Sequence, residues 1–481
     1  MRSVSERPGS LACVSNAIEV HARRVNNLPL PGRDARSLPK RVLTSPWTWV
    51  TVAAVLVYAV CLLDVYRMFT SPNTVTMPDG IKVAEIVPAA VWPSVKYALP
   101  TLAFWIVLYL IADRFRPQRP LVWFLALGWG AAVAVWGALY VNSWASLVLG
   151  AKDPADPRPA IFIAPFVEEA MKATVLFWLA ILVRYRLTSK VSLIALGGLS
   201  AAGFAFTENI VYYGRVVSYA ITSADAGNAD AFLMYQVLMR GVVTAFGHPL
   251  FTMMTATGLA IALRTRSKVV RVLAPLAGYL LAAFGHMFFN SQATLQPDEG
   301  AFMRIYFFVL LPLAVLAVVY AVRQEITQSR LIRARLTDYV RMGWLADGDP
   351  YVFSRSRTRF RALAIALTRG WPCWLATLRL QRSMTELAYL RDAEVAGIVD
   401  DASGLRVFDL LAVIRAARPA AVDDPRGQRL NLPRLSLPGR RKRPPSAYSP
   451  DDFGNWPPPS GGTAPMTGYS AVNPLWGPPP G

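Results

Sequence analysis

The chain has 481 residues, of which 54% are hydrophobic and 17% are charged, and its formal net charge is +20. The apolar residues gather in long runs, which argues against a chain of several soluble domains and indicates a protein that crosses a membrane repeatedly. In such a protein Lys and Arg collect in cytoplasmic segments, so the basic excess gives no reason to expect nucleic acid as a partner.

The polar segment of residues 1–46 comes first and contains eight Lys or Arg. Because a span needs about 20 mostly apolar residues, residues 47–322 are predicted to form an all-α bundle of about eight transmembrane helices. The predicted spans are residues 47–66, 94–112, 121–140, 160–183, 191–213, 238–263, 270–290 and 303–322.

The segments that connect these spans alternate in charge. Three of them, residues 113–120, 184–190 and 264–271, contain three, three and four Lys or Arg. The other four contain at most two basic residues each and carry Asp and Glu: residues 68–92, 141–159, 214–231 and 291–303. By the positive-inside rule, both termini are predicted to be cytoplasmic and the acidic loops to lie outside.

Beyond the last span the character of the sequence changes. Residues 323–416 are rich in Arg and show helical patterning, as in ITQSRLIRARLTDYV, which predicts a small cytoplasmic helical module. From residue 417 onward Pro, Gly and Ser accumulate. Such a composition buries too little apolar surface to fold, so residues 417–481 are predicted to be a disordered, Pro/Gly-rich basic tail.

Ionisable residues inside the predicted spans are the strongest functional signal. Each costs roughly 2.5–3.5 kcal/mol on insertion scales, so it is expected to face the bundle interior and to mark function. The fourth span contains Glu168, Glu169 and Lys172. Glu168 and Lys172 share one helical face. Glu169 is rotated from Glu168 by about 100°, so the two carboxylates are able to do different work.

Three further spans add polar residues to this set. Glu208 ends the segment FAFTE, which begins at Phe204 in span five. Two of the three histidines, His248 and His286, follow a glycine in spans six and seven, and each has a hydrogen-bonding residue four positions later, Thr252 and Asn290. Counted from the predicted span ends, Glu168, Glu208, His248 and His286 lie in one layer, roughly 6–12 Å below the outer surface.

Carboxylates and histidines gathered in one layer can activate water for attack on an amide. A Glu serves as general base, and a His donates a proton or stabilises the oxyanion. The same residue types also bind zinc. The sequence contains no HExxH motif and no GxSxG placed to supply a serine nucleophile. A metal-free and a metal-dependent hydrolase therefore both remain open.

Four motifs carry a resemblance to a known family: EEAMK at 168–172, FAFTE at 204–208, HPLFT at 248–252 and HMFFN at 286–290. Together they resemble the PrsW family of intramembrane proteases and, more distantly, the prenyl-protein (CAAX) type II proteases and bacteriocin-processing enzymes. Those relatives typically have FxxxH in the second motif, and the FxxxE found here favours PrsW. The motifs cover spans four to seven.

The resemblance implies a multi-pass protease of the bacterial cell membrane that cleaves membrane-anchored proteins near the extracytoplasmic side, as in the first cut of an anti-sigma factor. By the same resemblance, Glu168, Glu169, His248 and His286 are catalytic. The supporting residues are Lys172, Phe204, Glu208, Thr252 and Asn290. A metal-dependent version would hold Zn²⁺ with Glu169, His248 and His286, and a metal-free glutamate mechanism is an equal alternative. The expected partners are a membrane-anchored protein substrate and the lipid bilayer, and no nucleic acid is expected. The sequence does not indicate the oligomeric state.

Two other functions compete with proteolysis. A proton-coupled transporter also uses Glu, His and Lys within the membrane, but its site belongs near the midplane, and the sequence shows no inverted repeat. The third alternative is a non-catalytic scaffold that binds hydrophobic or lipidated partners, and the intact polar set argues against it.

Overall fold

The computed structural model describes residues 38–430, apart from short gaps at residues 73–74, 77–81, 116–117, 152–155, 184–186, 188, 223–227, 296–297 and 398–402. The first 37 residues of the predicted N-terminal segment lie outside the described residues. So do residues 431–481, which form most of the predicted disordered tail.

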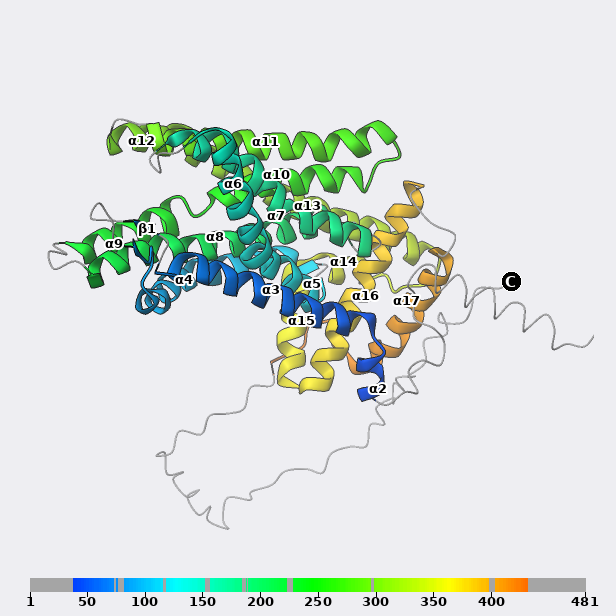
Figure 1. Cartoon of the computed structure of the whole chain (residues 1–481). Coiled ribbons are helices and arrows are strands. Elements are labelled where there is room, and N and C mark those ends of the chain that lie inside the picture. Colours follow the sequence, from blue (N-terminus) through cyan, green and yellow to red (C-terminus); the bar gives the residue numbers. More distant parts are fainter. Residues whose placement is uncertain are drawn as a thin grey trace, which may run out of the picture.

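The described part of the chain is almost entirely helical, which confirms the predicted all-α class (Figure 1). Its first half comprises α2 (Leu38–Leu43), α3 (Pro46–Thr70), α4 (Pro88–Ala112), η2 (Asp113–Phe115), α5 (Pro120–Gly128), η3 (Trp129–Ala134), α6 (Val135–Val148), η4 (Pro159–Ile163), α7 (Ala164–Val183) and α8 (Lys190–Thr222). A two-residue antiparallel ladder joins β1 (Val75–Thr76) to β2 (Lys82–Val83) between α3 and α4.

The second half continues with α9 (Ala229–Leu238), η6 (Met239–Val243), α10 (Gly247–Ala262), α11 (Lys268–Leu295), α12 (Glu299–Ile305), η7 (Tyr306–Leu310) and α13 (Leu311–Arg341). The chain ends its described part with α14 (Asp349–Ser354), α15 (Ser356–Thr368), α16 (Trp371–Val395), α17 (Ser403–Ala417) and η8 (Arg418–Ala420).

Among the described residues, seven helical stretches are long and apolar enough to cross a membrane. They are Pro46–Thr70, Pro88–Phe115, Pro120–Val148, Lys190–Thr222, Ala229–Ala262, Lys268–Leu295 and Gly300–Arg341. These stretches coincide with seven of the eight predicted spans. The remaining predicted span, residues 160–183, corresponds to η4 and α7, which differ from the others in composition because α7 carries Glu168, Glu169 and Lys172.

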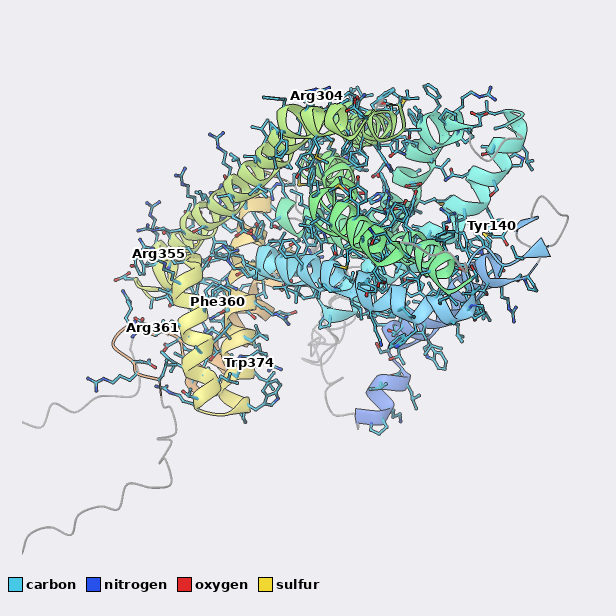
Figure 2. All side chains as sticks on the ribbon, turned by 90° about the vertical axis from the view of Figure 1, so that its left-hand side faces the viewer. Tyr140, Arg304, Arg355, Phe360, Arg361 and Trp374 are labelled. Atoms are coloured by element: carbon cyan, nitrogen blue, oxygen red, sulfur yellow. The ribbon has the colours of Figure 1, made fainter. Side chains whose placement is uncertain are left out.

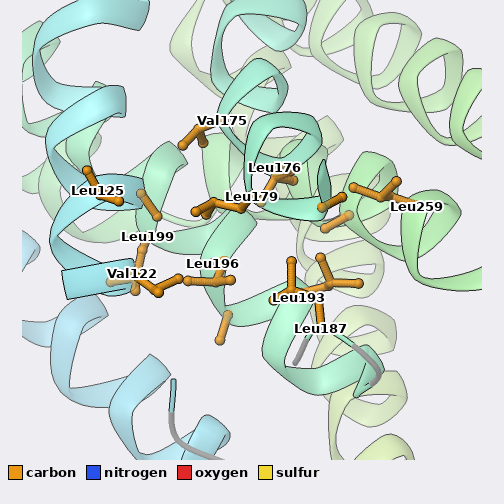
Figure 3. Close-up of a cluster of buried hydrophobic side chains, with 14 of the residues drawn as sticks. Val122, Leu125, Val175, Leu176, Leu179, Leu187, Leu193, Leu196, Leu199 and Leu259 are labelled. Carbon is orange, nitrogen blue, oxygen red and sulfur yellow. The ribbon is translucent and has the colours of Figure 1, made fainter. Parts of the chain in front are cut away.

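The hydrophobic core between these helices packs α7 and α8 against α5 and α10. Figure 3 shows its centre, where Leu176 and Leu179 of α7 meet Leu196 and Leu199 of α8. Leu176, Leu193 and Leu196 are completely buried. These contacts bury Val175, Leu176, Leu179 and Ala180 of α7, and they fix how this helix is rotated toward its neighbours.

Two glycines allow the third span to approach α8 at backbone distance. A Cβ added at Gly130 of η3 would lie 1.8 Å from the carbonyl oxygen of Ser200, and one at Gly203 of α8 would lie 2.2 Å from that of Leu127. Small residues at helix contacts are the usual means of close packing in membranes. The Ser200 hydroxyl in turn donates to the Lys172 carbonyl at 2.8 Å, which ties α8 to α7.

The segment after the last span folds as a helical module on one end of the bundle (Figure 1). Helix α13 continues without a break from the bundle into this module, where Ile332 and Leu336 are completely buried with Leu380 and Met384 of α16. Figure 2 shows Arg355, Phe360 and Trp374 on the module, away from Arg304 at the start of the last span. We call the bundle end that meets the module the module side.

The module is fastened to the bundle by charged side chains. Arg359 of α15 donates to the Phe115 carbonyl at 3.0 Å, and Arg264, after α10, pairs with Asp392 of α16 at 2.6 Å. These contacts join the module-side ends of the second and sixth spans to one folded unit.

The predicted boundary at residue 417 differs from the structure. Residues 418–430 pack against the module: Arg418 pairs with Asp349 at 2.7 Å, and Val422 is 1% exposed in a cluster with Ala362 and Ile365. The Pro-rich composition does not predict this packing, because a single buried valine and one ion pair are enough to hold a short segment against a surface that other helices form.

Candidate active site

The three ionisable residues of α7 meet inside the bundle. Glu169 and Lys172 are completely buried, and the Lys172 ammonium donates to Oε1 of Glu169 at 2.7 Å. The same ammonium lies 3.6 Å from Oε2 of Glu168 and 4.3 Å from the centre of the Phe204 ring. Because burying an isolated charge costs several kcal/mol, this pairing is what allows both charges to stay in the interior.

Both oxygens of Glu169 are occupied by polar partners from three helices. Oε1 lies 3.1 Å from Nδ1 of His286 on α11 in addition to its bond with Lys172. Oε2 accepts a hydrogen bond from the Thr252 hydroxyl on α10 at 2.7 Å. Glu169 is therefore a junction that fixes α7, α10 and α11 relative to one another.

A second chain of contacts begins at His248 on α10. Its Nε2 lies 2.8 Å from Oε2 of Glu208 on α8, and its Nδ1 lies 2.9 Å from the Lys172 ammonium. Glu208 also pairs with Arg240 of η6 at 2.7 Å. Arg240 donates to the Asn209 side chain and stacks 3.7 Å above the Tyr212 ring.

Glu168 has a different environment from Glu169. Its Oε2 is buried without a hydrogen-bond partner among the described residues, 3.9 Å from Nε2 of His286. A buried carboxylate oxygen without a partner is costly, and in a native site it calls for an explanation such as a missing ion or water. Oε2 of Glu168 thus faces the point where a ligand is expected.

The partners of the two histidines fix which ring nitrogen carries the proton. An ammonium only donates, so Nδ1 of His248 accepts from Lys172 and its Nε2 donates to Glu208. The carboxylate of Glu169 accepts from Nδ1 of His286, which leaves the lone pair of Nε2 on the side of Glu168. Each imidazole is therefore held by a carboxylate on one nitrogen. The other nitrogen of His248 accepts from Lys172, and the other nitrogen of His286 keeps its lone pair beside Glu168.

The cluster fits a divalent cation in both geometry and charge. The ligand-type atoms of Glu168, His248 and His286 lie within 4.8 Å of one another. The cluster contains three carboxylates, those of Glu168, Glu169 and Glu208, and two cations, Lys172 and Arg240. If both imidazoles are neutral, the cluster has a net charge of −1. Metal-bound histidines usually donate their other nitrogen to a carboxylate, which is the arrangement that Glu169 and Glu208 supply. Because Lys172 now occupies Nδ1 of His248, binding there requires that ammonium to turn away.

Local structure explains why His248 reaches the cluster. The sixth span is interrupted: η6 ends at Val243, and α10 begins only at Gly247. His248 thus lies in the first turn of α10, where Pro249 is tolerated because the amides of the first turn lack helical partners. Broken helices in membranes occur where the backbone is buried or lines a cavity.

The structure brings together nearly all of the residues that the sequence singled out. Glu168, Glu169, Lys172, Phe204, Glu208, His248, Thr252 and His286 form one connected cluster. Asn290 lies apart: its amide donates to the Ala160 carbonyl at 2.8 Å and so ties α11 to η4. The metal set named from the sequence included Glu169, whereas the set with converging ligand atoms contains Glu168.

Sequence reasoning missed Arg240, the residue that pairs with Glu208. It lies within the predicted sixth span, at residues 238–263, where any ionisable residue is a signal. Its partner Glu208 lies on another helix, α8, so this pairing depends on how the two helices pack.

A comparison with protein families gives a match over the part of the chain that contains the cluster. Residues 117–319 match the PrsW family intramembrane metalloprotease model. The match runs from just before α5 into α13, so it contains the whole cluster and leaves out α3, α4 and the module. It confirms the resemblance carried by the four motifs.

No curated protein and no solved structure gives a significant match to this chain. PrsW proteins are intramembrane peptidases, so the match supports intramembrane proteolysis by a multi-pass membrane protein.

Proposed function

We propose that this protein is a metal-dependent intramembrane endopeptidase whose site is the Glu168, His248 and His286 cluster. The observation that carries the proposal is Oε2 of Glu168, which is buried without a hydrogen bond among the described residues. It lies 3.6 Å from the Lys172 ammonium and 3.9 Å from Nε2 of His286, inside a cluster with excess negative charge. The substrates are membrane-anchored proteins. With the module side in the cytoplasm, as the charge pattern of the loops indicates, cleavage of an anti-sigma-factor-type substrate takes place toward the extracytoplasmic side.

The group that fits the cluster is a zinc ion held by Glu168, His248 and His286. When bound, it would lower the pKa of a coordinated water and polarise the scissile carbonyl. Three protein ligands leave a fourth position for water, as in catalytic zinc sites.

The remaining residues orient and balance this set. Glu169 holds the proton on Nδ1 of His286, and Glu208 holds the proton on Nε2 of His248, so both lone pairs stay directed into the cluster. In hydrolysis the water oxygen bonds to the carbonyl carbon, and the C–N bond breaks. The proton that the water loses passes to a carboxylate of the cluster and is returned to the leaving amine.

Metal binding is tested on the purified full-length chain by elemental analysis. We expect about one zinc per chain in the wild type and strong depletion in Glu168→Gln and His286→Gln. Asp64→Asn is the matched control, since Asp64 is a span carboxylate that accepts from Trp136 and Tyr140 far from the cluster. An active wild type that contains no metal would refute metal dependence and leave a glutamate mechanism.

Proteolysis itself is tested in liposomes that contain the purified chain and membrane proteins extracted from cells that lack it. New protein termini should appear with the wild type and with Asp64→Asn. Glu168→Gln should produce fewer than about one per cent of them, because removal of a group that activates water typically costs 10²-fold or more. Equal termini with Glu168→Gln would show that the site has been assigned wrongly.

A further inference from the structure

An apolar groove runs along the bundle beside the candidate active site. It encloses about 280 Å³ and is bounded by α4, α8, α10 and α13. Its lining is apolar except at the module side, where Arg114 and Glu325 close it. In a membrane such a space is not filled by water, so it is expected to hold a hydrophobic occupant.

The groove and the catalytic cluster share one wall. Phe246, Pro249 and Met253 line the groove from the start of α10, while His248 and Thr252 of the same helix face the cluster. The groove therefore starts at the level of the cluster. It extends from there toward the module side, over a length of α13 from Ala314 to Glu325. At 1.5 Å per residue this is about 16 Å.

The wall formed by α13 is suited to contact with another helix. Ala314, Ala317 and Ala321 line the groove at helical spacing, and small residues let a neighbouring backbone approach closely. The apolar part of this span is also little covered by the protein: 11% of it is buried, as in the second span, compared with 83% for α8. Its Val318, which lines the groove, is 63% exposed.

The module-side end of the groove offers a carboxylate. Glu325 lies 3.0 Å from Arg114 through Oε2, while its buried Oε1 has no hydrogen-bond partner among the described residues. Arg114 is shared with the Ser356 hydroxyl and the Ile111 carbonyl. A cation that reached the groove end would satisfy Oε1 of Glu325. Membrane-spanning helices carry such cations, because Lys and Arg flank their cytoplasmic ends.

We propose that this groove docks the transmembrane helix of the substrate, with the basic flank of that helix at Glu325 and its other half at the catalytic cluster. The inference rests on the proposed function and adds the docking path to it. The groove and the depth of the cluster together place the cut roughly three to five helical turns, or about 11 to 18 residues, from the basic flank.

Docking is tested by photocrosslinking in liposomes. The probe is a synthetic helix of about 20 Leu and Ala residues with two lysines at one end. The full-length chain carries Glu168→Gln and Glu169→Gln, and a photoreactive residue replaces either Val318 or its neighbour Val319, which is exposed but does not line the groove. We expect at least fivefold more peptide adduct from position 318. Equal adducts at both positions, or lipid adducts alone at position 318, would overturn the proposal.

The role of Glu325 is tested with the same adduct. Glu325→Gln should lower the yield with the lysine-flanked probe severalfold. It should leave unchanged the lower yield obtained with a probe in which glutamines replace the lysines. If Glu325→Gln lowers the adduct yield of both probes by the same factor, the carboxylate does not bind the lysine flank, and this part of the proposal is wrong.

A steric variant links docking to cleavage. Ala321→Phe narrows the groove, whereas Ala59→Phe adds the same bulk on the exposed face of α3. Ala321→Phe should lower both peptide adduct and proteolysis at least fivefold, while Ala59→Phe should lower neither. Full proteolysis without adduct in Ala321→Phe would refute docking and leave the proposed function standing. Adduct formation by a wild-type chain that cuts nothing would refute the proposed function and leave docking standing.

Discussion

Lys172 is the residue on which the electrostatics of the cluster depend. Its completely buried ammonium contacts Glu169 and His248 and lies over the Phe204 ring. Its removal leaves the buried carboxylate of Glu169 without its cation. An uncompensated buried charge is far more destabilising than the loss of the attraction itself.

We expect Lys172→Met to lower the free energy of unfolding by about 3–5 kcal/mol and to abolish cleavage. In the double variant Lys172→Met/Glu169→Gln, most of the stability should return because neither charge remains. Thermal unfolding in detergent, arranged as a double-mutant cycle, measures the coupling. If the loss of stability in the double variant equals the sum of the losses in Lys172→Met and Glu169→Gln, the two residues do not form a direct charge pair.

Arg240 acts on the cluster through another residue. It pairs with Glu208, and Glu208 accepts from Nε2 of His248. Arg240 therefore positions Glu208, which in turn sets the orientation of the imidazole.

Arg240→Gln should lower kcat by about tenfold or more, in the range lost when a partner of a metal-bound histidine is removed. KM should stay nearly unchanged, because Arg240 does not contact the substrate in this assignment. Arg240→Lys should restore part of the rate, since it keeps the charge. A rise in KM with unchanged kcat would show that Arg240 binds substrate instead.

Most residues of the cluster stood out in the sequence, but their pairing could not be predicted from it. Glu168, Glu169, Glu208, His248 and His286 stand out because ionisable groups are costly in a span. The helical angle between Glu168 and Glu169 predicted that they would differ. Only the packed structure shows that Glu169 has both oxygens occupied, whereas Glu168 keeps one open. Contacts between helices depend on packing that one helix's sequence does not encode.

At the scale of helices, close packing of the third span against α8 sets the position of the cluster. Gly130 of η3 touches the Ser200 carbonyl, and Ser200 donates to the Lys172 carbonyl. A change in the distance between η3 and α8 would therefore also move α7, through the hydrogen bond from Ser200 to Lys172.

Gly130→Ala should destabilise the fold by about 1–3 kcal/mol, the usual cost of overpacking, because the added methyl group meets a backbone carbonyl. Gly137→Ala in the same span is the matched control, since its Cβ would meet only the flexible side chain of Met171 at 3.1 Å. Thermal unfolding of the two variants checks this. Equal losses would show that the close approach at Gly130 is not a constraint.

At the scale of the whole molecule, the described residues form a membrane bundle and a module joined by the unbroken helix α13. Seven of the eight predicted spans match long apolar helices of the structure, and they were predictable because the run length of apolar residues sets them directly. The continuous helix α13, from Leu311 to Arg341, could not be predicted in the same way. Its first half is apolar and its second half is rich in Arg, so the sequence pattern indicates two separate elements. The packing of residues 418–430 was missed for a similar reason: it depends on a surface formed by other helices.

Truncation separates the packed part of the C-terminal segment from the rest. A chain that ends at residue 430 should keep the melting temperature and the activity of the full chain. A chain that ends at residue 417 should lose about 1–3 kcal/mol, because it lacks the Val422 contact and the Arg418–Asp349 ion pair. Equal melting temperatures for the two truncated chains would show that residues 418–430 contribute nothing to the module.

The central claim is that the cluster of α7, α8, α10 and α11 cleaves membrane-anchored proteins, and its most direct test is made in the native cell. Quantitative proteomics would compare new termini of single-pass membrane proteins between cells with the wild type, the Glu168→Gln/Glu169→Gln double variant, and Asp64→Asn at matched expression. The account predicts termini that are present with the wild type and Asp64→Asn and absent with the double variant. Identical termini in all three would contradict proteolysis and would favour transport or scaffolding by the same bundle.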